Sequence, residues 1–415
     1  MSKKDNVAAV PKYRFPEFAL DASIDYVAGG FIFDPITNRN HHADLPILAI
    51  TQEYGAIPRD EIDYKVSVTK KSLKAYKIVE KGDFIISLRS FQGGIEYSMY
   101  DGICSPAYII LRKKTNIIDQ YYKYYFKSHR FIQDLNKDLE GIRDGKMISY
   151  GQFSSILLPK PDEEEQQKIV DCLSSIDDLI SVEENKLSLL NDYKKGWMQK
   201  LFPTEGRNVP EWRFPEFQDN KEWETAKLIN IADYRRGSFP QPYGLAKWYD
   251  EFYGMPFIQV FDVDDNMRLK ATTKNKISKL ASKQSVFIGK GTLIVTLQGS
   301  IGRVAITQYD AYIDRTLLLF EKFYMDIDKV FFAYIIQRLF EIKKQSAPGG
   351  IIKTITKQAL SEFTVKLPER PEQEKIAKFL SGIDDLTSTQ TDRIESLKQH
   401  KKALMQGLFP VAEEV

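Results

Sequence analysis

Lys168-Ile-Val-Asp-Cys-Leu-Ser-Ser-Ile-Asp-Asp-Leu179 returns 207 positions later as Lys375-Ile-Ala-Lys-Phe-Leu-Ser-Gly-Ile-Asp-Asp-Leu386. A second stretch, Val10-Pro-Lys-Tyr-Arg-Phe-Pro-Glu-Phe18, returns 199 positions later as Val209-Pro-Glu-Trp-Arg-Phe-Pro-Glu-Phe217. Because the two offsets are nearly equal over half of the chain, the sequence contains two copies of one unit.

Between these blocks the two copies match only faintly. Leu45-Pro-Ile-Leu48 corresponds to Met255-Pro-Phe-Ile258, and Lys81-Gly-Asp-Phe-Ile-Ile-Ser-Leu88 corresponds to Lys290-Gly-Thr-Leu-Ile-Val-Thr-Leu297. The pattern predicts a duplicated frame that carries two divergent inserts.

The composition of the chain sets wide bounds. With 415 residues, of which 43% are apolar, the chain is long enough for two cores. The net charge of +2 is too small to mark a nucleic-acid binder, so such a role requires local clusters of charge. Two cysteines make a disulfide framework implausible and favour a reducing compartment. No signal peptide and no apolar run of ~20 residues are present, so a cytoplasmic location without a membrane is expected.

Each copy contains a long heptad pattern. Neither glycine nor proline occurs from Glu163 to Lys195, and apolar residues recur there at alternating steps of four and three. Each predicted helix has roughly 34 residues and a length of about 50 Å. The residues expected to form the seam are Ile169, Leu173, Ile176, Ile180, Leu187 and Leu190 in the first helix, and Ile376, Leu380, Ile383, Ile394 and Leu397 in the second.

The simplest partner for each helix is the other helix, paired antiparallel about a pseudo-two-fold axis. Leu201-Phe-Pro203 leads into the second Val-Pro segment, whereas Leu408-Phe-Pro410 ends the chain where such a segment would follow. The start and the end of the chain are therefore expected to be neighbours, which gives circular symmetry. The alternative is that the two are core helices of unrelated domains.

These patterns predict a mixed α/β (α+β) fold. Residues 1–160 and 204–367 form the two variable domains, and residues 161–203 and 368–415 form the two helical spacers.

Each insert contains a basic stretch. No acidic residue occurs from Asn266 to Tyr309, which carries eight positive charges, or from Tyr64 to Val79, which carries five lysines. Such stretches suit a polyanion, because neutralised phosphates release counterions. The alternative is a solvated lysine face that keeps the protein soluble.

Basic residues and glycine-bearing loops supply the candidates for DNA contact, since their side chains have the donors and acceptors that read base edges. In the first insert they are Lys70, Lys71, Lys74, Arg89, Ser90, Gln92, Arg143 and Lys146, and in the second Arg235, Arg236, Lys274, Lys276, Gln298, Ser300, Arg303 and Lys353.

Several kinds of catalytic site are missing from the sequence. It has no phosphate-binding loop, no Asn-Pro-Pro-aromatic tetrapeptide of amino-methyltransferases, and four dispersed histidines without cysteines at zinc spacing. Asp162 and the Glu184-Asn-Lys186 triplet imitate a nuclease, but ~30 Å of helix separates the two carboxylates. We therefore expect no catalytic, cofactor-binding or metal-binding residue in this chain.

The chain resembles the specificity subunit of type I DNA restriction-modification systems. The resemblance covers essentially the whole chain, and its strongest marks are Pro368-Glu-Arg-Pro-Glu-Gln-Glu-Lys-Ile376 and Ile383-Asp-Asp385. The first copy, Pro159-Lys-Pro-Asp-Glu-Glu-Glu-Gln-Gln-Lys-Ile169 with Ile176-Asp-Asp178, departs slightly from this pattern. The first insert also lacks a counterpart of Trp223.

The resemblance implies that each variable domain is a target-recognition domain, which reads one half of a split, asymmetric sequence in double-stranded DNA. It implies that the helices set the gap between the halves. Two methylation subunits would bring S-adenosylmethionine, restriction subunits would bring ATP and Mg, and this chain would be non-catalytic. The alternatives are a stand-alone regulatory or architectural DNA-binding protein and, as a third class, an independent enzyme.

Overall fold

The computed structural model describes residues 8–41, 44–62, 70–137, 148–346 and 360–410. The chain divides into two compact units. Unit 1 comprises Met1–Glu184 and Arg393–Val415, and unit 2 comprises Asn185–Asp392. Both cuts fall inside a long helix, so these units differ from the four segments expected from the sequence.

Unit 1 is an α+β domain with short antiparallel strands. Its largest sheet has the order β3-β10-β7-β8, and smaller sheets are β1-β2-β11, β4-β5 and β6-β9. The elements are β1 (Ala8–Ala9), β2 (Ile24–Ala28), α1 (Gly29–Ile32), β3 (Phe33–Ile36), β4 (Leu48–Thr51), β5 (Gly55–Pro58), α2 (Lys70–Leu73), β6 (Lys77–Val79), β7 (Phe84–Ile86), α3 (Ser90–Gly93), β8 (Glu96–Tyr97), β9 (Gly102–Cys104), β10 (Ile109–Lys113), α4 (Asp119–Tyr125), α5 (His129–Asn136), α6 (Tyr150–Ser155) and β11 (Leu157–Pro159).

Unit 2 repeats this plan with additions. Its sheet β13-β20-β17-β18 matches the largest sheet of unit 1 strand for strand, and it also has the sheets β15-β14-β19-β16 and β12-β21. The elements are β12 (Glu224–Lys227), α8 (Leu228–Ile231), β13 (Ala232–Arg236), β14 (Met255–Ile258), β15 (Asn275–Ile277), α9 (Lys279–Ser282), β16 (Val286–Ile288), β17 (Leu293–Thr296), β18 (Val304–Ile306), β19 (Ala311–Ile313), β20 (Leu317–Phe323), α10 (Lys329–Ser346) and β21 (Thr364–Leu367).

The faint sequence echo in the inserts therefore has a structural meaning. Strands β7 and β17, which lie in the echoed Lys-Gly segments, occupy the same position in the two matching sheets. The second echo diverges, because β4 pairs only with β5 whereas β14 lies between β15 and β19.

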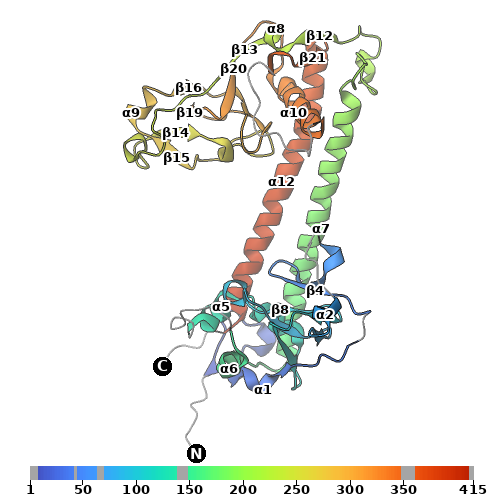
Figure 1. The fold of residues 1–415 in the computed structure, drawn as a ribbon, viewed down its shortest axis with the longest axis vertical. Helices are drawn as coiled ribbons and strands as arrows, with labels where there is room; N and C mark the ends of the chain where they lie inside the picture. The colour runs from blue at the N-terminus through green and yellow to red at the C-terminus, as the bar shows by residue number, and fades with distance from the viewer. Residues whose placement is uncertain (1–7, 42–43, 63–69, 138–147, 347–359, 411–415) are drawn as a thin grey trace, which may run out of the picture. The chain divides into compact units, whose positions relative to one another are not determined.

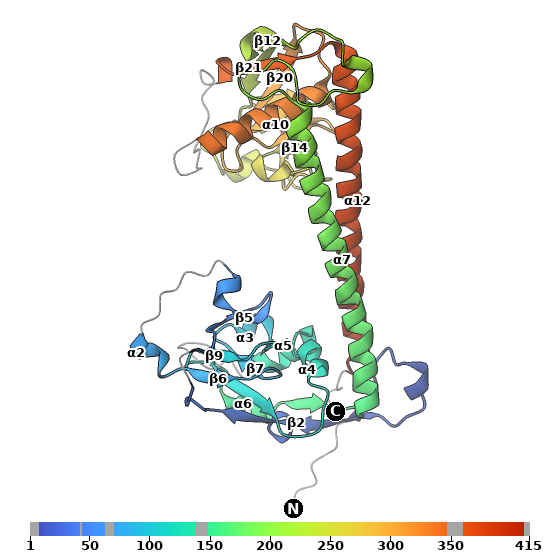
Figure 2. The same ribbon diagram turned by 90° about the vertical axis from the view of Figure 1, so that its right-hand side faces the viewer.

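Two long helices run through both units. Helices α7 (Glu163–Leu201) and α12 (Arg370–Leu408) each have 39 residues, somewhat more than the 34 expected from the heptads. Both end directly before a Phe-Pro pair, because a residue before proline is disfavoured in the α conformation. Figure 1 shows α10 of unit 2 lying against α12, and Figure 2 shows the strands of unit 1 at the first turns of α7.

The antiparallel pairing predicted for the helices is confirmed within each unit. In unit 1 the Lys401 ammonium of α12 lies 2.5 Å from the Asp177 carboxylate of α7, and Arg393 Nε lies 2.7 Å from Glu183. Residue numbers therefore fall along α12 as they rise along α7. The seam residues are buried (Ile169, Leu173, Ile180, Ile376, Leu380, Ile383, Ile394) or half-buried (Ile176, Leu187, Leu190, Leu397).

The repeated motifs bind each other in each unit. Arg14 forms two hydrogen bonds of 2.8 Å with the Glu165 carboxylate, and Arg213 binds Glu372 in the same bidentate way at 2.9 and 2.6 Å. The carboxylates belong to the first turns of α7 and α12 and are 3% and 2% exposed. The Arg-Phe-Pro-Glu-Phe segment of each copy is thus attached to the start of a long helix.

A glutamine next to each of these glutamates joins the helix to the variable domain. Gln166 accepts a hydrogen bond from the backbone N–H of Ile118 (2.9 Å) and donates one to the Pro161 carbonyl (2.7 Å). Gln373 makes the same pair of bonds in unit 2, with the backbone N–H of Asp328 and the carbonyl of Pro368, both at 2.9 Å. The Glu-Gln pair that occurs in both repeats is therefore explained by buried structural hydrogen bonds and requires no catalytic role.

The same segments also bind the end of the opposite helix. In unit 2 the backbone N–H of Trp212 donates to the Lys200 carbonyl at the end of α7 (3.0 Å). In unit 1 the N–H of Tyr13 donates to the Gly407 carbonyl at the end of α12 (2.8 Å). A Cβ at Gly407 would lie 2.0 Å from the Tyr13 ring, so glycine permits this approach. The expected proximity of the first Val-Pro segment and the end of the second long helix is confirmed within unit 1.

We predict that the Arg213–Glu372 pair contributes strongly to the stability of unit 2. Replacing one partner, as in Glu372→Gln, leaves a buried guanidinium without its counterion and should lower the free energy of unfolding by about 3–5 kcal/mol. The double replacement Arg213→Met with Glu372→Leu should cost less, since no charge stays buried. Urea unfolding of the three variants tests this, and a double variant less stable than Glu372→Gln would contradict it.

Candidate nucleic-acid interface

Most of the candidate residues of unit 2 lie at one end of the sheet β13-β20-β17-β18. Strands β13 and β17 both end where β20 begins: Arg236 is opposite Leu318, and Thr296 is opposite Leu317. Arg235 and Arg236 therefore lie at the same sheet end as the turn that follows β17. That turn holds Gln298, Ser300 and Arg303.

The turn after β17 has a fixed backbone and exposed polar side chains. Gly299 and Gly302 have φ angles of 65° and 82°, which other residues rarely adopt. The Thr296 hydroxyl donates to the Ser300 carbonyl at 2.5 Å. Gln298 and Ser300 are exposed, so their side chains are available to a ligand.

Arg303 is only half-buried, and it already has protein partners. Its guanidinium lies 2.7 Å from Asp265 and donates to the Val263 carbonyl at 3.3 Å. Arg235 similarly lies 2.6 Å from Glu321. Both pairs are at least partly exposed, and such pairs are weak, so a phosphate can compete for either guanidinium.

The segment from Val260 to Asp265 connects this turn with the lysines. The backbone N–H of Lys274 donates to Asp262 Oδ1 (2.9 Å), and the Lys274 ammonium lies 5.1 Å from the centre of the Phe261 ring. Burial raises the pKa of the Asp262 carboxyl, which is fully inaccessible to solvent. Lys274 itself is exposed and Lys276 is half-buried, so a rigid loop presents the ammonium of Lys274 to solvent.

Unit 1 brings together the matching turns. The Gln52 side chain, after β4, donates to the Arg89 carbonyl, after β7, at 3.1 Å. Arg89, Gln92 and, on the segment that follows α2, Lys74 are exposed. Ser90 is 1% exposed and its hydroxyl accepts a hydrogen bond from the Ser87 backbone N–H (2.9 Å). The side chain of Ser90 is therefore not exposed in this structure, unlike those of Arg89 and Gln92.

The remaining candidates are only partly described or not described. Lys70 and Lys71 lie on α2, whose first side chains the structure does not describe. Arg143, Lys146 and Lys353 lie outside the described residues.

Unit 2 has an exposed aromatic pair that was not among the residues predicted from the sequence. Phe252 and Tyr253 are 85% and 93% exposed in a turn whose backbone N–H groups donate to Asp250 Oδ1 at 3.2 and 2.9 Å. A Cβ at Gly254 would lie 2.2 Å from the Asp250 carbonyl oxygen, so this glycine closes the turn. The sequence feature that could have indicated this turn is the pair of aromatic residues directly before a glycine, whereas the predicted contacts were mainly basic residues and glycine-bearing loops.

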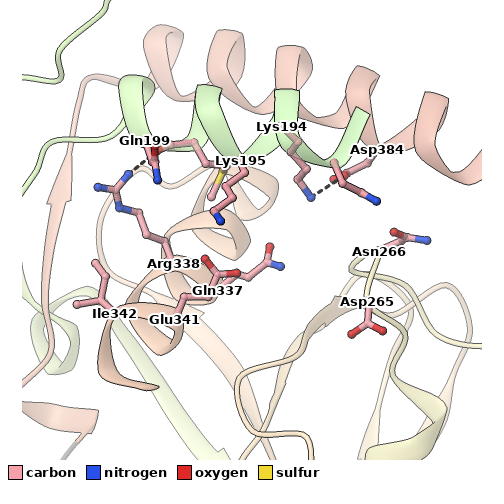
Figure 3. A pocket seen from close by; sticks show the side chains of 12 residues that line it. Lys194, Lys195, Gln199, Asp265, Asn266, Gln337, Arg338, Glu341, Ile342 and Asp384 are labelled. Carbon is pink, nitrogen blue, oxygen red and sulfur yellow. Dashed lines mark hydrogen bonds and ion pairs between the residues drawn. The ribbon is translucent and has the colours of Figure 1, made fainter. Parts of the chain in front are cut away.

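Unit 2 also contains a cavity of about 530 Å³ between α7, α10 and the Asp265–Asn266 loop (Figure 3). Two cations on its α7 and α10 walls are already engaged. Lys194 pairs with Asp384, and the Arg338 guanidinium donates to the Met198 carbonyl. The cavity therefore offers no unpaired charge from these two residues to a ligand.

Metal and membrane sites were sought only among the described residues. No group of three or more histidine, cysteine, aspartate or glutamate side chains there could hold a metal ion. In the same part of the chain, no helix is long and apolar enough to cross a membrane.

Comparison with known proteins gives a consistent result. The family model for the type I restriction modification DNA specificity domain matches twice, at residues 30–192 and 220–399. A putative type I restriction enzyme MjaX specificity subunit from Methanocaldococcus jannaschii is 25% identical, and the alignment covers 84% of this chain and 82% of that protein. The MjaVIII specificity subunit of the same organism is 26% identical, with 85% and 83% covered.

Solved structures share the fold. A chain from a study of the assembly and conformational transition of a type I restriction-modification system has a TM-score of 0.58 at 16% identity, with 92% of this chain and 97% of that chain covered. The type I S subunit from M. genitalium has a TM-score of 0.54 at 14% identity, with 97% and 100% covered. Since the family model matches twice and spans most of the sequence, the chain belongs to the type I restriction-modification DNA specificity family.

Proposed function

We propose that this chain selects the DNA sequence for a type I restriction-modification complex by reading one half of a bipartite target with each unit. The observation that supports this most is the twin arrangement of turns. In unit 1 the segment after β4 contacts the turn after β7, and in unit 2 the segment after β14 contacts the turn after β17. The frame is the same, but the exposed side chains differ, as two different half-sites require.

Within each unit we assign different tasks to different side chains. The ammonium of Lys274 suits phosphate, since a lysine contributes affinity without sequence information. Gln298 and Ser300 carry neutral donors and acceptors on a fixed turn and suit base edges. Phe252 and Tyr253 suit contact with a base or a sugar face.

The chemistry of the complex belongs to other subunits in this proposal. Methylation subunits hold S-adenosylmethionine, restriction subunits hold ATP and Mg, and this chain supplies recognition and a docking surface. The sequence contains neither a phosphate-binding loop nor the Asn-Pro-Pro-aromatic tetrapeptide of amino-methyltransferases.

Helix α7 offers a suitable docking surface for a methylation subunit. Leu189 and Tyr193 are 69% and 53% exposed. Because they are four positions apart, they lie on one face of the helix, away from the seam. The corresponding positions of α12 are Ser396 and His400, both polar, so this exposed apolar stripe is a property of α7.

The bipartite assignment predicts the outcome of a domain exchange. Replacing residues 19–160 with the insert of a relative keeps both the Arg14 segment and α7, so the frame should still assemble. Methylome sequencing of cells that carry this chimaera should show one half of the motif changed and the other half intact. A change in both halves, or in neither, would refute the assignment of one half-site to each unit.

The phosphate assignment predicts a specific salt dependence. The double variant Lys274→Gln with Lys276→Gln should weaken binding to cognate and unrelated DNA alike. The slope of log K against log salt should fall by about one for each lost phosphate contact. Lys227→Gln is the control, because this exposed lysine is paired with Glu362 elsewhere in the unit. An unchanged slope in the double variant would show that these lysines do not contact phosphate.

The docking assignment predicts a loss of assembly without a loss of stability. Leu189→Glu combined with Tyr193→Glu places two charges on the exposed stripe and should abolish co-purification with the methylation subunit. The melting temperature should change little, since Leu189 is 69% exposed and Tyr193 is 53% exposed, with an edge contact to the Trp197 ring. Leu20→Glu, at a fully exposed leucine of unit 1, is the control. Normal assembly of the double variant would exclude this face of α7 as the docking surface.

A further inference from the structure

The two units contain the same three-residue polar cluster. In each, a tyrosine of the variable domain and a lysine from the end of one long helix bind a single aspartate near the start of the other. The clusters are Tyr124, Asp177 and Lys401 in unit 1, and Tyr334, Asp384 and Lys194 in unit 2.

In unit 1 the aspartate uses both of its oxygens. The Tyr124 hydroxyl donates to Asp177 Oδ2 (2.9 Å) and the Lys401 ammonium donates to Asp177 Oδ1 (2.5 Å). The ammonium also lies 5.0 Å from the centre of the Tyr124 ring. One carboxylate therefore connects α4 of the variable domain, α7 and α12.

The unit 2 cluster has the same geometry and is more buried. The Tyr334 hydroxyl donates to Asp384 Oδ2 and the Lys194 ammonium to Asp384 Oδ1, both at 2.5 Å. The Lys194–Asp384 contact is drawn in Figure 3. The Asp384 side chain is 11% exposed, whereas that of Asp177 is 37% exposed. Burial and the neighbouring carboxylate raise the pKa of the Tyr334 hydroxyl, so it stays a donor.

The two tyrosines are the informative members. The aspartates and lysines belong to the repeated helices and keep the 207-residue offset, but Tyr124 and Tyr334 come from the divergent inserts and are 210 positions apart. Helices α4 and α10 also differ in length, 7 against 18 residues. The two inserts thus differ in sequence and in helix length, yet each places a tyrosine hydroxyl against the equivalent aspartate of a long helix.

A contact with two oxygens restricts rotation more than one hydrogen bond does. A turn of the variable domain about the helix pair breaks the tyrosine bond, and a slide of one helix along the other breaks the lysine bond. Each broken bond leaves a partly buried charge or donor without its partner, which is costly. In unit 2 an ion pair adjoins the cluster, because Arg268 of the variable domain lies 2.7 Å from Asp385 of α12.

We propose that Asp177 and Asp384, each with its tyrosine and lysine, are positioning residues that fix the recognition domains on the helix pair and thereby determine how strictly the gap between the DNA half-sites is measured. This inference rests on the proposed bipartite recognition. In this inference the two clusters control how much the gap length may vary. They do not control the affinity for DNA or the choice of bases.

The experiment compares methylation of DNAs that share the native half-sites but differ in gap length by one or two base pairs. The proteins are the full complex with wild-type chain, with Tyr124→Phe, with Tyr334→Phe and with both. Each exchange removes one hydroxyl and keeps the ring. The preference for the native gap should fall about tenfold per variant, since a hydrogen bond to a charged group is worth about that factor. The more buried Tyr334 should show the larger effect.

The matched control is Tyr122→Phe on the same helix α4. The Tyr122 hydroxyl is buried and donates to the Pro159 carbonyl at 2.9 Å, within the domain, so its loss should leave gap preference unchanged. Lys401→Arg should retain the preference because the charge is kept, whereas Lys401→Met should lose it.

Equal loss of methylation at every gap, insolubility of the Phe variants or an unchanged preference would each overturn the proposal, since the cluster would then serve folding alone. A wild-type complex indifferent to gap length would instead overturn the bipartite function itself.

Discussion

Each compact unit is built from the start of one long helix and the end of the other, and the buried arginine–glutamate pairs hold that arrangement together. Arg14 and Arg213 anchor their segments to the first turn of one helix, and the neighbouring backbone of Tyr13 and Trp212 binds the last turn of the other. Neither unit can be completed without both helices. The duplicated sequence therefore produces one chain in which helix pairing and domain folding depend on each other.

This dependence explains where the sequence is repeated. Glu165, Gln166, Asp177 and their copies all contact an element outside their own helix, so a change in one requires a change in its partner. In the turns after β7 and β17 the side chains of Arg89, Gln92, Gln298 and Ser300 are exposed, so the frame does not constrain them. These side chains can therefore differ between the two units while the frame stays the same.

The long helices and their pairing could be predicted, because the heptad spacing and the internal repeat can be read directly from the sequence. The seam from Ile169 to Leu190, the antiparallel pairing and the closure between Tyr13 and Gly407 all belong to this class. The site was harder to predict, because burial of a loop side chain depends on tertiary contacts. Ser90 satisfies a backbone group, and Arg303 has an acidic neighbour that no local pattern reveals. The tyrosine–aspartate–lysine clusters depend on the register between distant helices, which the sequence does not specify.

In the proposed function, the helix pair sets the distance between the two DNA half-sites that the two units recognise. Inserting one heptad after Glu184 and one after Asp392 leaves both compact units unchanged and keeps the apolar seam in phase. Each helix grows by about 10 Å, or roughly three base pairs of DNA at ~3.4 Å per step. Methylome sequencing should then show both original half-sites with a gap about three base pairs longer. A well-folded extended protein whose complex still methylates only DNA with the original gap would contradict this.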